Sequence, residues 1–120
     1  MGDYKQLGVW QKAHQLTLDI YHATADLPRD EQYGLSSQLK RAAASIPANI
    51  AEGSGRGGDA ELARFLRIAM GSAYEVEYHL LVAHELSFLT TDQYQQLDGQ
   101  IAEVIRMLAG LIKSLNVKRG

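Results

Sequence analysis

Cysteine is absent from this 120-residue sequence, so a disulfide bond and a thiolate nucleophile are both excluded. Proline occurs only twice, at Pro28 and Pro47, which allows long uninterrupted helices. No apolar run approaches the ~20 residues that span a bilayer, and the start of the chain does not resemble a signal peptide. We therefore expect a cytoplasmic protein that has no membrane partner.

The sequence also lacks a strong excess of either charge. Its 12 lysines and arginines and 14 aspartates and glutamates give a formal net charge of −2. A surface that is basic all over is therefore excluded, and any contact with nucleic acid requires a local patch. The hydrophobic share of 46% is typical of a globular protein, and the length fits one domain over residues 1–120. We expect frayed ends at residues 1–7 and 116–120.

Apolar residues recur every three or four positions in four segments, which is the spacing of amphipathic α-helices. The predicted helices cover residues 8–26, 35–53, 59–87 and 91–115. Pro28 ends the first helix, because the residue before a proline is pushed out of the helical conformation. Asp59 is predicted as the N-cap of the third helix. Four such helices with short connections predict an all-α, up-down-up-down four-helix bundle.

The predicted core consists of the apolar positions that repeat along one stripe of each helix. They are Leu16, Ile20, Leu39, Ile46, Ile50, Phe65, Ala69, Val76, Leu80, Ile101, Ile105, Leu108 and Ile112. A further set of apolar residues lies off the stripe of the third helix, namely Ile68, Tyr78, Leu81 and Val82. A single bundle seam does not need this second surface, so we expect part of it, with Trp10 and Tyr21, to form an oligomer contact. Gly71 and Ser72 are expected to permit a close approach of another helix.

Pro47 interrupts the second predicted helix without changing its apolar phase, which Leu39, Ile46 and Ile50 maintain. A proline inside a helix has no N–H and crowds the carbonyl four residues earlier, here that of Ala43, at a cost of about 3 kcal/mol. We predict one continuous helix with a kink at Pro47 rather than two helices. The four glycines of residues 53–58 then predict the end of this helix and a turn.

Two patterns suggest ligand chemistry, but their context argues against it. Residues 53–58 match G-x-G-x-x-G, yet a dinucleotide fingerprint needs a strand before it, and here a helix precedes it. The four histidines, which are His14, His22, His79 and His84, lack the spacing of metal ligands. No base–nucleophile pair is evident either. We expect no catalytic residues, no metal and no cofactor.

Asn49 and Glu52 are the most notable polar pair, because they lie three residues apart on one helical face directly after Pro47. A functional interpretation makes them a site for a partner or RNA. A structural interpretation, which we favour, is that they satisfy backbone groups freed by Pro47 or cap a neighbouring helix.

Basic residues are concentrated between positions 33 and 72. The candidates for nucleic-acid contact there are Lys40, Arg41, Arg56, Arg64 and Arg67. Against the three acidic residues of the same segment, Glu52, Asp59 and Glu61, these five give a local charge of +2. Contacts to phosphate from such residues would give salt-dependent affinity, whereas the alternative is an ordinary solvated face with intrahelical ion pairs.

Residues 35–56 resemble the signature of the small four-helix-bundle proteins encoded within intervening sequences of 23S ribosomal RNA. The matching positions are Leu35 to Gln38, Lys40 and Arg41, Ser45 to Pro47, Ala48 to Gly53, and Gly55 with Arg56. The resemblance extends over nearly the whole chain, to residues 9–13 upstream and to Arg64, Phe65, Ala69, Gly71 and Ser72 downstream.

This resemblance implies a four-helix bundle that assembles into a homo-oligomer, with a pentameric ring as the suggested form. It also implies a non-enzymatic accessory role in association with structured RNA or a ribonucleoprotein, without a small-molecule substrate. One alternative is an oligomeric adaptor that binds another protein and never contacts nucleic acid. A further alternative is an accessory factor of a reverse transcriptase, although such relatives look strongly basic and this chain does not.

Overall fold

The structure, a computed structural model, describes residues 3–31 and 34–117, which form four long α-helices and two short 3₁₀ helices. The long helices are α1 (Gly8–Thr24), α2 (Leu35–Gly55), α3 (Asp59–Glu85) and α4 (Thr91–Val117). The 3₁₀ helices are η1 (Tyr4–Gln6) and η2 (Arg29–Glu31), and neither was predicted. All four predicted starts are confirmed, and each predicted end lies within two residues of the observed one. Residues 118–120 of the tail that was expected to fray lie outside the described residues.

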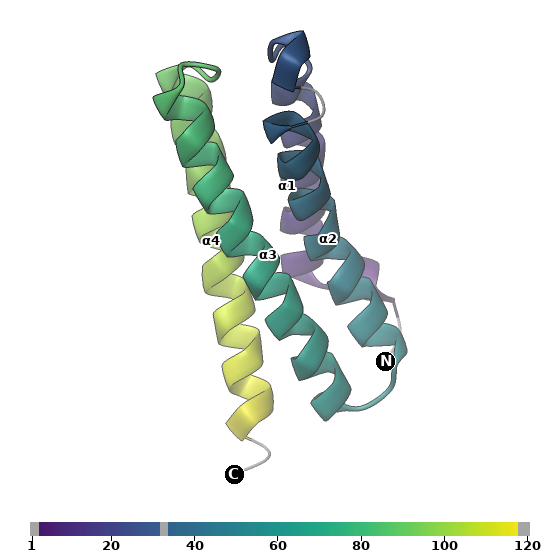
Figure 1. Ribbon diagram of the computed structural model, residues 1–120. Coiled ribbons are helices and arrows are strands. Elements are labelled where there is room, and N and C mark those ends of the chain that lie inside the picture. The colour runs from purple at the N-terminus through teal and green to yellow at the C-terminus, as the bar shows by residue number, and fades with distance from the viewer. Residues whose placement is uncertain (1–2, 32–33, 118–120) are drawn as a thin grey trace.

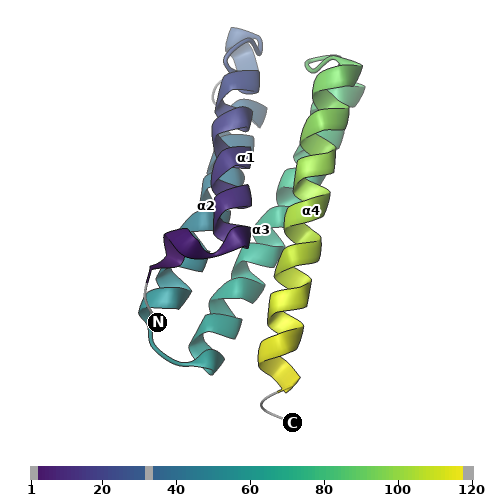
Figure 2. The ribbon, with the colours of Figure 1, turned by 180° about the vertical axis from the view of Figure 1, so that it is seen from behind.

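Consecutive long helices run in opposite directions (Figures 1 and 2). Each packs against two others, in the cyclic order α1, α2, α3, α4, and the most extensive packing is between α2 and α3. The result is an elongated bundle of 46 × 20 × 20 Å. The α1–α2 and α3–α4 connections lie at one end of this bundle, and the α2–α3 turn lies at the other (Figure 1). No helix in the described ranges is long and apolar enough to cross a membrane.

The core lies along the axis of the bundle and confirms most of the predicted positions. Ile105 and Ile112 are corrections, because both are only partly buried, at the rim of the core. The buried stripe of α4 instead passes through Leu97, Ile101, Val104 and Leu108. Ile105 follows Val104 by one residue, about 100° around the helix, and therefore faces the edge of the stripe. Leu66, which is fully buried in α3, was not predicted.

The start of α4 has a capping motif, and the start of α3 brings one correction. At α4, Thr90 Oγ1 accepts a bond from the Gln93 N–H at 3.0 Å, and Gln93 Oε1 accepts one from the Thr90 N–H at 2.9 Å. This reciprocal pair is a capping box. At α3, Asp59 is the first helical residue, and Gly58 with a φ of 110° occupies the N-cap position. Asp59 and Glu61 lie in the first turn of α3, where the helix dipole favours negative charge.

A close helix approach was expected at Gly71 and Ser72; it occurs at Ser72 but not at Gly71, and Gly53 provides a further one. A Cβ atom built on Gly53 would lie 2.8 Å from the Cβ of Phe65, so α2 and α3 pack there at a distance that only glycine allows. A Cβ atom on Gly71 would meet nothing within 4 Å. The neighbouring Ser72 does contact α2, where its hydroxyl is hydrogen-bonded to that of Ser45.

Pro47 lies inside α2, which continues for eight residues beyond it to Gly55. The prediction of a continuous helix is therefore confirmed. The kink at Pro47 stays a prediction.

Candidate functional site

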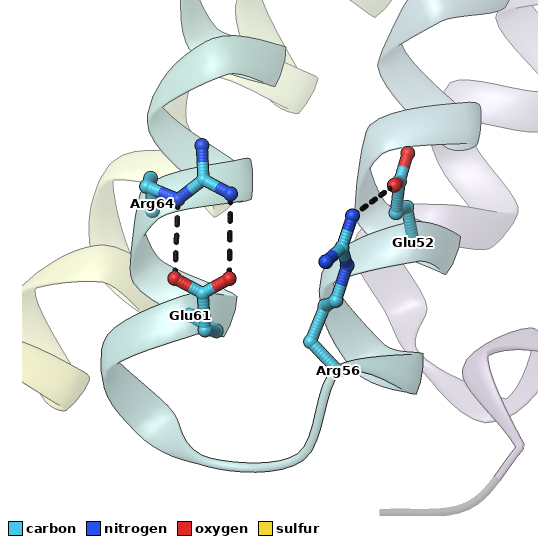
Figure 3. A network of polar contacts seen from close by, with 4 residues as sticks. All are labelled: Glu52, Arg56, Glu61 and Arg64. Atoms are coloured by element: carbon cyan, nitrogen blue, oxygen red, sulfur yellow. Dashed lines mark hydrogen bonds and ion pairs between the residues drawn. The ribbon is translucent and has the colours of Figure 1, made fainter.

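The turn between α2 and α3 carries two of the predicted nucleic-acid contacts. Gly57 and Gly58 have φ values of 74° and 110°, which glycine adopts readily and other residues rarely do. They reverse the chain immediately after Arg56, so that the first turn of α3 comes to lie beside the last turn of α2 (Figure 3). Arg56 and Arg64 thereby approach the same aromatic ring, that of Phe65. Their guanidinium carbons lie 5.1 and 4.5 Å from its centre.

Each of these arginines is paired with a glutamate three or four residues earlier in the chain (Figure 3). Arg56 Nη2 donates to Glu52 Oε2 at 2.7 Å. Arg64 donates to both carboxylate oxygens of Glu61, from Nε at 3.1 Å and from Nη2 at 3.3 Å. The hydrogen bonds from Arg64 lower the pKa of Glu61 below its ordinary value. Both pairs are exposed, so solvent weakens them, and a competing anion can replace the carboxylates.

The other predicted basic residues do not all gather at this end. Arg67 is exposed one turn after Arg64 in α3. Lys40 and Arg41 lie near the start of α2, and Lys40 is about 24 Å along the helix from Arg56. The ammonium group of Lys40 instead lies 5.4 Å from the centre of the Tyr21 ring.

The predicted local charge of +2 is therefore divided between two places. At the α2–α3 end, three arginines face three acidic residues, which are Glu52, Asp59 and Glu61, so the sum there is zero. The surplus of +2 belongs to Lys40 and Arg41, near the opposite end of the bundle. Contact with a polyanion at the α2–α3 turn would accordingly depend on guanidinium geometry rather than on net charge.

Asn49 and Glu52 have different partners. Asn49 Nδ2 donates to the carbonyl of Ser45 at 2.8 Å, a backbone bond next to Pro47 of the kind that the structural interpretation expects. Glu52 pairs with Arg56 and contacts no freed backbone group. The carbonyl that Pro47 deprives of its helical donor is that of Ala43, and Thr17 Oγ1 of α1 donates to it at 3.1 Å. Sequence reasoning missed Thr17, because nothing local indicates which residue of another helix faces Ala43.

The histidines mostly contact neighbours on the surface. The rings of His14 and Trp10 stack at 4.8 Å, and those of His84 and Tyr94 stack at 4.4 Å. His79 Nε2 lies 3.5 Å from the carboxylate of Glu75, one turn earlier in α3. Within residues 3–31 and 34–117, no group of three or more histidines, aspartates or glutamates could hold a metal ion.

A shallow groove between α3 and α4 is a feature that the sequence did not single out. We call it the α3–α4 groove; it has a volume of about 360 Å³ and is lined by Glu77, Tyr78, Leu81, Tyr94 and Asp98. Burial raises the pKa of the Tyr94 phenol above its ordinary value of 10.0, and the carboxylates of Asp98, Glu77 and Glu85 raise it further. The groove is thus both aromatic and acidic. Tyr78 and Leu81 were the only signal for it in the sequence, as apolar residues off the stripe of α3.

Comparison with protein families gives a match that spans most of the chain. The model described as "23S rRNA-intervening sequence protein" matches residues 5–110. The chain belongs to this family. A crystal structure of a protein of unknown function from the S23 ribosomal protein family of Bacteroides thetaiotaomicron is similar, with a TM-score of 0.79 and 27% sequence identity. That similarity covers 88% of this chain and 98% of the other. No curated protein matches.

Proposed function

We propose that this 23S rRNA-intervening sequence protein is a non-enzymatic, oligomeric binding protein of the cytoplasm that associates with structured RNA or a ribonucleoprotein. The observation that carries the RNA part is the pair of guanidinium groups on Phe65, at the exposed turn between α2 and α3. Guanidinium groups are well suited to phosphate, because their planar fork matches two phosphate oxygens. The family's description, which names 23S rRNA, supports the same function.

In this proposal the phosphate of the RNA displaces Glu52 and Glu61 from the arginines. Both carboxylates are exposed, so little free energy holds them in place. Contacts of this kind favour no particular sequence, and the affinity falls steeply as salt concentration rises.

RNA binding by the wild type and by Arg56→Glu with Arg64→Glu, measured at two salt concentrations, tests the proposal. We expect binding by the wild type at low salt and loss of binding by the double variant. Glu52→Gln with Glu61→Gln should bind more tightly than the wild type, because the competing carboxylates are gone. Arg106→Glu with Lys113→Glu changes two exposed residues of α4, alters the net charge by the same amount and serves as the control for net charge. Equal binding by wild type and arginine variant, or no binding at low salt, would favour an adaptor that does not contact RNA.

A second candidate function, a protein–protein adaptor, has an observation of its own. Large exposed apolar side chains concentrate on α3 and the residue after it, where Ile68, Tyr74, Tyr78, Leu81 and Leu86 are each at least 39% exposed. Such a surface is typical of association with protein. The same surface supports self-assembly, whether the protein binds RNA or acts as an adaptor. The pentameric ring that the family resemblance implies requires such self-assembly. Light scattering at micromolar concentration would contradict self-assembly if it gave the 13.2 kDa mass of one chain.

We also propose that α2 bends at Pro47. The support is that Pro47 lacks the N–H that would hold the carbonyl of Ala43 in the helix, and that this carbonyl accepts from Thr17 of α1 instead. Comparison of the α2 axis in crystal structures of wild type and Pro47→Ala would test the bend. We expect a smaller bend in Pro47→Ala, and a straight α2 axis in the wild type would contradict the proposal.

A further inference from the structure

Two surfaces on opposite edges of the bundle have complementary charge. The first is the α3–α4 groove, which carries the carboxylates of Glu77 and Asp98. Neither carboxylate forms an ion pair with a lysine or arginine in the described part of the chain. The second surface, which we call the α1–α2 face, consists of Leu18, Tyr21, Lys40 and Arg41. Since the helices pack in the cyclic order α1, α2, α3, α4, these two edges lie opposite each other.

The α1–α2 face combines exposed apolar surface with positive charge. Leu18 and Tyr21 are 41% and 47% exposed, one turn apart on α1. Lys40 of α2 lies over the Tyr21 ring, and the adjacent Arg41 is exposed. The α3–α4 groove combines exposed apolar surface with negative charge instead. Its Tyr78 and Leu81 are 62% and 39% exposed and lie beside the two carboxylates.

The two surfaces also lie at the same height along the bundle. Tyr21 precedes the end of α1 by three residues, and Lys40 follows the start of α2 by five. Leu81 precedes the end of α3 by four residues, and Tyr94 follows the start of α4 by three. Both surfaces are therefore near the end of the bundle that holds the α1–α2 and α3–α4 connections (Figure 1). Two copies with parallel axes can bring one surface against the other without a shift along the axis.

From these observations we propose that the α3–α4 groove binds the α1–α2 face of a second copy of this chain, with Glu77 and Asp98 against Lys40 and Arg41. The inference rests on the self-assembly proposed above and assigns its contact. Because one patch binds a different patch, the contact is head-to-tail and repeats around a ring. A bundle face of 46 × 20 Å is large enough for the ~800 Å² per partner that stable contacts bury.

Charge reversal on each surface, followed by reversal on both, tests the contact. Glu77→Lys with Asp98→Lys places positive charge against Lys40 and Arg41, and Lys40→Glu with Arg41→Glu places negative charge against the groove. Like charges across an interface are strongly unfavourable, so each double variant should weaken self-association on the order of 100-fold or more. The quadruple variant restores complementarity within every contact, whatever the number of subunits, and should associate like the wild type.

Sedimentation velocity over a concentration series gives the dissociation constants, and a far-ultraviolet circular dichroism melt shows that each variant is folded. Glu75→Lys is the control, because Glu75 lies on another face of α3, 200° around the helix from Glu77. It should leave the dissociation constant unchanged. Folded double variants that associate as the wild type does would overturn this contact and leave self-assembly through another surface standing. A monomeric wild type would overturn both the contact and the proposed self-assembly.

Discussion

The hydroxyl of Thr17 in α1 donates a hydrogen bond that is shared between two backbone carbonyls, that of Ala13 in its own helix at 2.8 Å and that of Ala43 in α2 at 3.1 Å. This carbonyl would accept from the N–H of residue 47 in an ordinary helix, but residue 47 is a proline and has none. A side chain of the neighbouring helix thus replaces the missing backbone donor. The replacement lets α2 continue through Pro47 and ties α1 to α2 at that level.

Thr17→Val should destabilise the protein by about 1–3 kcal/mol, because it leaves a buried carbonyl without a donor. In a Pro47→Ala background residue 47 has its N–H again, so the cost of Thr17→Val should be smaller by about 1 kcal/mol. Urea denaturation of the four proteins of this double-mutant cycle measures the difference. Thr24→Val is the control, since the Thr24 hydroxyl is also buried and, like that of Thr17, donates to a carbonyl of α1, but it makes no bond to another helix. An equal cost of Thr17→Val in both backgrounds would contradict the claim that the Thr17 hydroxyl replaces the backbone N–H that Pro47 lacks.

Gly53 and Gly71 should respond in opposite ways to alanine. Gly53→Ala places a methyl group 2.8 Å from the Cβ of Phe65, and the overpacking should cost about 1–3 kcal/mol. Gly71→Ala meets nothing within 4 Å and gains helix propensity, so it should stabilise the protein by up to about 1 kcal/mol. Thermal midpoints measured at one protein concentration decide between these effects. A stabilised Gly53→Ala would show that α2 and α3 are further apart than the structure has them.

The sequence was sufficient for the helices because the signals that define them are local. Apolar periodicity, the capping box at Thr90 and the glycines after Gly53 all act within a few residues of the boundaries they set. Contacts between helices depend on rotation and height, which local spacing does not determine. The partner of Ala43 was unpredictable for this reason. The grouping of Lys40 with Arg56 in one patch was an avoidable error, because the rise of a single helix already separates them by about 24 Å.

The adjacent residues Val104 and Ile105 test the rotation of α4 about its own axis, because the sequence alone placed Ile105 in the core. Val104 is fully buried and Ile105 is only partly so. Val104→Ala should therefore cost about 1–3 kcal/mol, and Ile105→Ala should cost less although it removes more carbon atoms. Leu80→Ala, at a fully buried position of α3, should cost about 2–5 kcal/mol. If chemical denaturation showed Ile105→Ala to be the costlier of the adjacent pair, the rotation of α4 would be wrong.

The environment of Tyr94 predicts a loss of stability at alkaline pH. Burial raises the pKa of its phenol above the ordinary value of 10.0, and the carboxylates around the α3–α4 groove add to the effect. The folded state thus disfavours the phenolate. Stability should be unaffected below pH 10 and should fall as the pH rises through the raised pKa, because the unfolded chain loses this proton more readily. Tyr94→Phe should reduce that fall, as measured by urea denaturation at a series of pH values. Tyr74→Phe, at an exposed position of α3, is the control and should leave it unchanged.

The most direct test of the central claim is sedimentation velocity of the wild-type protein with a fluorescently labelled, structured RNA at low salt. The sedimentation of protein and RNA together reports both the number of subunits and the presence of RNA. An oligomeric RNA-binding protein predicts one species that contains several 13.2 kDa chains and the RNA, and that releases the RNA when salt is raised. Single chains that sediment separately from free RNA would contradict it.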